Sequence, residues 1–295
     1  QSVTNNWAQS ETVEAVLDER TSRRPLTLDQ LRSIEPDRPG AGLYFADAEI
    51  YRLSVKARRS LTDRVQIGLA LPVMRFHGGI GDAPIQETHE AFGIPPTGRE
   101  GVPRDAFALY VRRADGEEVF LDQAPSAALG DMTATLKLRL TPAESDWLLA
   151  VEGVAKLPTG DEESLYGSGE VDYGAQLLGT AFFSRSCLHL GLGAVRTGGS
   201  EVLGVGERTV WNLFLGYEHR LARNWSWVVQ GTFSESPLGE LEIPGLTEDQ
   251  FLIDLALKRG VGRRGAFFVA LSENYRNFGS SPDVGLHVGF SAIVR

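Results

Sequence analysis

The side chains with the clearest chemical potential are charged groups that alternate with apolar residues along strand-like segments. Lys137 and Arg139 alternate with leucines on one segment, and Glu152 and Lys156 alternate with apolar residues on the next. Because successive side chains of a strand point to opposite faces, a closed wall of such strands would turn these charges to one side. We expect a polar interior lined by Asp131, Lys137, Arg139, Glu152, Lys156, Asp172, Asp254, Lys258 and Glu273.

Two interpretations of this charged interior stay open. In the first, the charges pair across neighbouring strands and help to fill a closed interior, as a barrel of about twelve strands permits. In the second, they line a charge-screened path for small solutes.

The histidines and serines predict neither a metal site nor a hydrolase. The pair His89-Glu90 has Gly93 where a zinc motif needs its second histidine, and the other histidines are dispersed. Gly167-Ser168-Gly169 is expected to be a loop, because no G-x-S-x-G elbow is present. We therefore predict no enzyme, no metal and no cofactor.

The elements that must position the charges are long strands with one apolar face. Residues 208–221 set Trp211, Leu213 and Leu215 against polar or small residues, with a period of two. The same alternation predicts strands over 63–75, 128–140, 145–158, 168–183, 186–196, 224–236, 248–259, 263–276 and 282–294, after a first strand near 2–9.

One predicted strand, 42–57, breaks the pattern. Asp47 and Glu49 share a face with Leu53 and Val55. We therefore expect a bulge or a change of register in this strand.

The connections between strands alternate in length down the chain. Those near 58–62, 141–145, 184–186, 221–224 and 259–263 are short. The connections that alternate with them are mostly longer and lie at 10–41, 76–126, 159–168, 197–207, 236–247 and 276–282. Outer-membrane barrels have this asymmetry, with short periplasmic turns and long outer loops. The sequence thus predicts an all-β, antiparallel, transmembrane up-and-down barrel of about twelve strands, with both termini on the periplasmic side.

Composition is compatible with this fold and excludes others. No apolar run approaches the roughly 20 residues of a membrane-spanning helix. The net charge of −10 and the pI of about 5.1 argue against a nucleic-acid partner. Cys187 is the single cysteine, so no intrachain disulfide can form. The segment that starts at Gln1 does not have the pattern of a signal peptide, and we expect that such a peptide preceded it and has been removed.

The long outer loop 76–126 has structure of its own. We expect a short helix between Asp82 and Gly93, then a hairpin over 106–122 that turns at Asp115-Gly116. The hairpin should project into water or fold over the pore. Candidate plug residues in this loop are Asp82, His89, Phe92 and Arg99.

Short motifs in this order resemble an uncharacterised bacterial outer-membrane family, the domain of unknown function 3187 family. They are Gly78-Gly79-x-x-Asp82-x-x-Ile85-x-x-x-His89-x-x-Phe92-Gly93 with Arg99, Gly130-Asp131, Leu157-Pro158-Thr159-Gly160, Gly167-Ser168-Gly169 and Pro282-Asp283. The Gly-Asp and Leu-Pro-Thr-Gly elements are also similar to the outer-membrane family of the phenol-degradation meta-pathway. The last strand, with His287, Gly289, Ala292 and Val294, is similar to the signal read by the barrel-assembly machinery, although it ends without an aromatic residue.

The resemblance implies one outer-membrane barrel domain over 1–295, in contact with outer-membrane lipid and lipopolysaccharide. The function we expect is passive movement of small solutes, with loop 76–126 as gate or plug. The alternatives are a non-conducting scaffold barrel, a barrel enzyme acting on lipid, and a soluble lipocalin-like binding barrel.

Overall fold

The wall of the barrel is built from strands that follow one another in the chain. The structure is a computed structural model and describes residues 1–79, 82–83, 87, 98–262, 264–276 and 284–294. Twelve antiparallel strands close into the barrel, which confirms the predicted fold class. They are β1 (Ser2–Gln9), β2 (Leu43–Ser60), β3 (Val65–His77), β7 (Met132–Arg139), β8 (Trp147–Leu157), β9 (Asp172–Phe182), β10 (Ser186–Thr197), β11 (Arg208–Ala222), β12 (Trp225–Ser234), β13 (Gln250–Val261), β14 (Gly265–Arg276) and β15 (Val284–Ala292).

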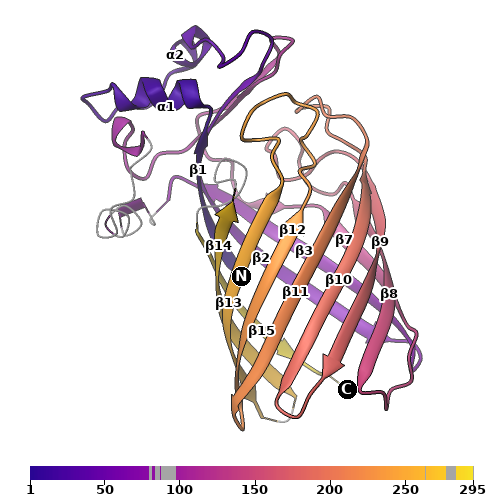
Figure 1. Cartoon of the computed structure of the whole chain (residues 1–295). Helices are drawn as coiled ribbons and strands as arrows, with labels where there is room; N and C mark the ends of the chain where they lie inside the picture. Colours follow the sequence, from indigo (N-terminus) through magenta and orange to yellow (C-terminus); the bar gives the residue numbers. More distant parts are fainter. Residues whose placement is uncertain (80–81, 84–86, 88–97, 263, 277–283, 295) are drawn as a thin grey trace.

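The barrel closes where β1 pairs with both β2 and β15. Ser2 lies opposite Arg52 on one side and His287 on the other, and Gln9 lies opposite Phe45. In Figure 1 the N-terminus lies on the wall and the C-terminus near the end that carries the short turns. We call the other end, with the long connections, the loop end.

Alternating side chains explain why these segments become membrane strands. On β7, Leu136 and Leu138 are 56% and 45% exposed, whereas Lys137 between them is turned inward. Moving a leucine side chain out of water stabilises a folded protein by about 1.5–3 kcal/mol. Whole rows of leucines on the outer face of the barrel therefore need hydrocarbon around them. The outward faces are therefore the lipid-facing surface.

Close packing on the inner face requires glycine at particular positions. Gly191 on β10 lies directly opposite Phe214 on β11, and a Cβ at Gly191 would overlap the Phe214 ring. The missing side chain lets the ring lie across β10 and fill part of the interior.

Above the wall, β2 continues into an outer sheet. β4 (Ala108–Arg112) pairs with residues 43–47 of β2, and β5 (Glu118–Leu121) pairs with β4, which confirms the predicted hairpin. A short β6 (Ala128–Leu129) pairs with β3. The sequence allowed the hairpin either to project into water or to fold over the pore. In the structure it extends away from the barrel (Figure 1).

Two helices cover the outward face of this outer sheet. The first, α1 (Glu11–Asp18), is followed by α2 (Leu28–Ser33), and a 3-10 turn, η1 (Arg99–Gly101), contacts α1. They form a core beside the rim, made of Val13, Leu17, Leu26, Leu31, Ile34, Leu43, Phe45, Val102 and Tyr110. In Figure 1 both helices lie to one side of the loop end and not over the opening.

Sequence reasoning missed these helices by treating 10–41 as a loop. The signal was present, because Thr27 and Gln30 form a reciprocal capping box at the start of α2. No helix in the described part of the chain is long and apolar enough to cross a membrane.

Candidate functional site

The candidate site is the polar interior of the barrel. The pairing of the strands turns eight of the nine predicted lining residues toward this interior. They are Asp131, Lys137, Arg139, Glu152, Lys156, Asp172, Asp254 and Lys258.

Glu273 does not belong to this set. It pairs directly with Ile253 on β13 and Val284 on β15, and it shares a face with the lipid-facing Leu271. Partners in an antiparallel pair point to the same side, so Glu273 faces outward near the loop end. Its assignment to the lumen was wrong because it rested on charge instead of alternation.

The first charged group lies near the loop end and centres on Lys156. Its Nζ is 3.0 Å from Asp131 and 2.9 Å from Asp172. Asp131 also accepts hydrogen bonds from the amides of Gly160 at 2.9 Å and Ser168 at 3.1 Å. Burial raises the pKa of Asp131, but these amides and Lys156 outweigh burial and hold the pKa below its usual value. The group thus ties loop 158–171 to the wall.

A second group lies halfway down the barrel. Lys137 and Glu152 form an ion pair at 3.0 Å, and Gln176 donates to Glu152 at 2.8 Å. Across the interior, Ser272 contacts Asp254 and lies 2.8 Å from Nε2 of His287. Because the carboxylate binds the serine and not the imidazole, this arrangement lacks the geometry of a proton relay to a nucleophile.

The third group is near the turn end and is the most open to water. Lys258 on β13 reaches across β12 to Glu218 on β11 at 3.1 Å, and Ser226 donates to Glu218 at 2.6 Å. The side chain of Lys258 is 44% exposed although it points inward. The interior at this level therefore holds water-accessible space.

Sequence reasoning missed another set of inward charges, on β2. Arg52, Lys56 and Arg58 alternate with Leu53 and Val55, which are 50% and 61% exposed on the opposite face. The alternation itself was the available signal, but the acids on the same strand obscured it.

The acids of β2 are explained by a loop that covers them. β2 pairs with β1 from Phe45 to Arg52 and with β3 from Glu49 to Ser60, without a shift of register, so the expected bulge is absent from these pairings. Asp47 and Glu49 face outward but are only 4% and 2% exposed, because Arg99 and neighbouring loop residues lie over them.

Two of the four candidate plug residues meet at this place. Arg99 forms ion pairs with Asp82 and, at 2.7 Å, with Asp47, and its guanidinium lies 4.5 Å from the centroid of the Trp7 ring. Asp82 also accepts hydrogen bonds from Asn5 and from the amide of Asp105. We call Asp47, Asp82, Arg99 and Trp7 the wall latch. It lies on the outward face of β1 and β2, so Asp82 and Arg99 do not plug the lumen; His89 and Phe92 lie outside the described residues.

Other outer loops pack against the inner face of the same wall. Tyr44, 2% exposed, forms a core with Val205, Leu241 and Ile243 from loops 198–207 and 235–249. Tyr166 of loop 158–171 stacks on Phe76 with ring centroids 5.0 Å apart. These three loops shape the mouth of the barrel.

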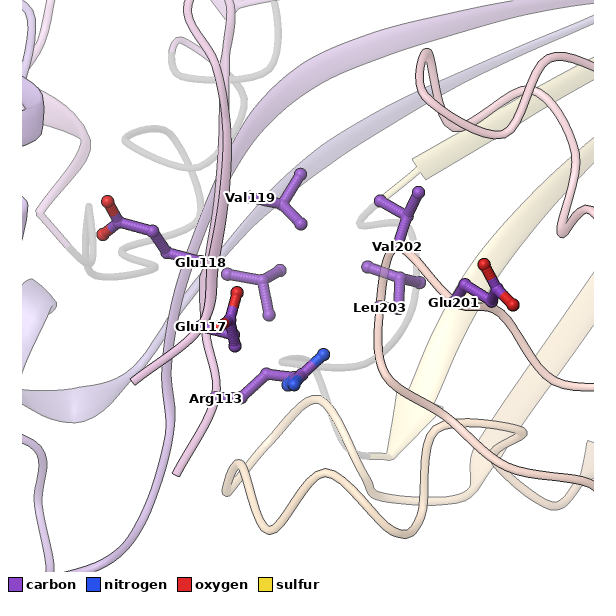
Figure 2. Close-up of a pocket in the computed structure, with 8 residues that line it drawn as sticks. Arg113, Glu117, Glu118, Val119, Glu201, Val202 and Leu203 are labelled. Atoms are coloured by element: carbon purple, nitrogen blue, oxygen red, sulfur yellow. The ribbon is translucent and has the colours of Figure 1, made fainter. Parts of the chain in front are cut away.

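A small pocket lies between one of the mouth loops and the hairpin. It has a volume of about 230 Å³ and is lined by Val111, Arg113, Glu117, Glu118, Val119, Glu201, Val202 and Leu203. Figure 2 shows Val119 on the hairpin side facing Val202 and Leu203 across it. Arg32 donates to Glu118 and lowers the pKa of that carboxyl. Among the described residues, no cluster of histidine, cysteine and carboxylate ligands could hold a metal ion.

Comparison with known proteins places this architecture in a family. The family described as "Protein of unknown function (DUF3187)" matches residues 41–292. The chain belongs to the DUF3187 family. The match confirms the resemblance inferred from the short motifs and covers eleven of the barrel strands, β2 to β15. No curated protein matches the sequence.

This DUF3187 protein is similar to several solved structures. The COG4313 outer membrane channel from Pseudomonas putida F1 is 12% identical, with a TM-score of 0.51 over 99% of this chain and 94% of that one. The toluene transporter TbuX of Ralstonia pickettii is 11% identical, with a TM-score of 0.40 over 84% and 68% of the two chains. Outer membrane phospholipase A of Escherichia coli is 8% identical, with a TM-score of 0.40 over 99% and 89%. The likeness to the COG4313 channel, whose TM-score is above 0.5, shows the barrel fold and nothing finer.

Proposed function

We propose that this barrel is a passive channel for small polar solutes across the outer membrane of a Gram-negative bacterium. The observation that carries the proposal is the hydrated interior at Lys258, whose inward side chain is 44% exposed. A barrel filled only by its own side chains would bury that ammonium group. An unsolvated charge is strongly destabilising, so the exposure of Lys258 indicates water inside the barrel.

The path that we propose begins at the mouth loops and ends among the short turns. The pocket beside Glu201 offers solutes a first contact that is part apolar and part charged. Below it lie the groups around Lys156, Glu152 and Glu218. In this proposal the loops around Tyr44 gate the opening, in place of the expected loop 76–126, whose described latch residues lie outside the barrel.

Outer-membrane lipid, lipopolysaccharide and the barrel-assembly machinery are the partners that this proposal requires. The exposed rows of leucine and aromatic residues on the outward faces fit a lipid solvent and do not fit a soluble lipocalin-like barrel. We propose transport and no catalysis.

A non-conducting scaffold is the second candidate, and one observation favours it. The core around Tyr44 joins two mouth loops to the opposite wall, which narrows the opening. Reconstitution in planar bilayers separates the two candidates. We expect discrete current steps from purified, heat-modifiable barrels, and folded barrels without current would leave the scaffold as the better proposal.

A further inference from the structure

A row of cations lines one side of the lumen along β2. Arg52, Lys56 and Arg58 lie directly opposite Met74, Ala70 and Gly68 of β3, respectively. Gly68 in turn lies opposite Thr135 of β7, which points inward with Lys137. The pairing therefore turns all three cations toward the interior, where Arg139 of β7 adds a fourth near the turn end.

These cations are open to water and electrostatically uncompensated. Arg52, Lys56 and Arg58 are each exposed, and no ion pair joins any of them to a residue within the described ranges. Arg139 differs in being half-buried, and its buried Nε has no hydrogen-bond partner among those residues. Their charges are free to act on a solute in the lumen.

The inward carboxylates, in contrast, are already occupied. Glu152 is bound by Lys137 and Gln176, and Glu218 by Lys258 and Ser226. Asp172 is bound by Lys156, and Asp254 by Ser272 and Gln230. A chain with a net charge of −10 thus presents an excess of free positive charge inside its barrel.

Small residues on β3 give the cations room. A Cβ at Gly68 would lie 3.4 Å from Cγ of Arg58, and the neighbouring inward position is Ala70, opposite Lys56. The long side chains can therefore extend over β3 into the lumen. Guanidinium and ammonium groups bind carboxylate and phosphate oxygens with charge-assisted hydrogen bonds.

We infer that the lumen selects small oxyanions, carboxylates or phosphates, and that Arg52, Lys56 and Arg58 form the strip along which they bind. This inference rests on the proposed channel function and names the class of solute. The cations concentrate anions near the turn end and repel cations, because a charge acts over roughly 8–10 Å before salt screens it.

The neighbouring Arg59 provides a matched control. It lies on the opposite face of β2 from Arg58, on the side of Leu53 and Val55, and it is also exposed. Reversal potentials in a KCl gradient should show anion preference for the wild type. The triple variant R52Q/K56Q/R58Q should lower the anion-to-cation permeability ratio by about two-fold for each charge removed, and Arg59→Gln should leave it unchanged.

A second measurement does not depend on conduction. Phenylglyoxal modifies exposed arginines, and mass spectrometry of the folded barrel in detergent reports each site. Phosphate or acetate, in separate arms, should slow modification of Arg52 and Arg58 but not of Arg59. The arm that protects more strongly identifies the preferred oxyanion.

The outcomes separate the two claims. Folded barrels that carry no current contradict the channel, whereas protection of Arg52 and Arg58 in the same sample still supports anion binding. A current with cation preference, or equal effects of Arg58→Gln and Arg59→Gln, would overturn the inference and leave the channel standing. Equal protection of all three arginines would overturn it as well.

Discussion

Replacing Arg99 by glutamine should release the outer loop from the barrel wall. Arg99 is 6% exposed, and its guanidinium pairs with Asp47 and Asp82 and covers the ring of Trp7. The substitution leaves two buried carboxylates without their cation. We expect residues 98–107 to detach while the strands below stay paired, because those strands are held by their own ladders.

The magnitude follows from the contacts that are lost. Removing one partner of a buried ion pair costs about 3–5 kcal/mol, and a buried cation–π contact adds about 0.5–2 kcal/mol. These values overlap for a single side chain, so we take about 3 kcal/mol as a lower bound. At about 1.4 kcal/mol for each factor of ten, local opening should increase by at least about 100-fold.

The amide of Asp105 reports this opening directly, since it donates to Asp82 at 2.8 Å. Its hydrogen exchange, measured in detergent or lipid, should accelerate by that factor in Arg99→Gln, while amides of β4 serve as the internal reference. Glu100→Gln, an exposed neighbour, should change nothing.

A further variant tests whether charge is the cause. Adding Asp47→Asn and Asp82→Asn to Arg99→Gln removes the uncompensated carboxylates and should recover part of the protection. Unchanged exchange at Asp105 in Arg99→Gln would refute the reasoning, because the latch would then contribute nothing to the docking of the loop.

Three other predictions concern the mouth, the wall and one loop. Tyr44→Ala should destabilise the core that Tyr44 forms with two mouth loops by about 3–5 kcal/mol. We expect faster proteolysis of 198–207 and a larger single-channel conductance. Gly191→Val should strain the contact with Phe214 by about 1–3 kcal/mol in urea unfolding from lipid vesicles, whereas Gly231→Val, which meets open space, should be neutral. The pKa of Asp131 is lowered in the folded protein, so the stability that this carboxylate contributes is complete above the unfolded pKa of 3.8 and is lost as pH falls through the lower folded pKa. Protection of 158–171 from hydrogen exchange should therefore hold from pH 7 to about 4 and then fall. Asp131→Asn should reduce this protection at pH 7.

Much of the wall could be predicted because lipid imposes one rule on every strand. Alternation predicted all twelve barrel strands close to their observed bounds, including β1, which the structure confirms at Ser2–Gln9. Charged residues also occur on the outward face near the loop end. Asp47 and Glu49 face outward there and are buried beneath loop residues, whereas Glu273 faces outward as its alternation with Leu271 requires.

The outer loops could not be placed because their positions depend on distant partners. The wall latch joins Trp7, Asp47 and Asp82 to Arg99, and no local pattern indicates that these side chains meet. The same holds for Tyr44 and Ile243, which are far apart in the chain and share one core. Of the site, the inward charges were predictable from alternation, and their pairing and exposure were not.

The barrel's solvent can be measured directly with single cysteines, since Cys187→Ser removes the only natural one. Leu213 and Asn212 are adjacent on β11, and only Leu213 is turned outward, with 41% exposure. In reconstituted vesicles, a fluorophore at Leu213→Cys should be quenched by nitroxide lipids, and one at Asn212→Cys should be quenched instead by a water-soluble agent. Equal quenching of both positions by lipid, or by water, would contradict a hydrated lumen enclosed by a lipid-facing wall.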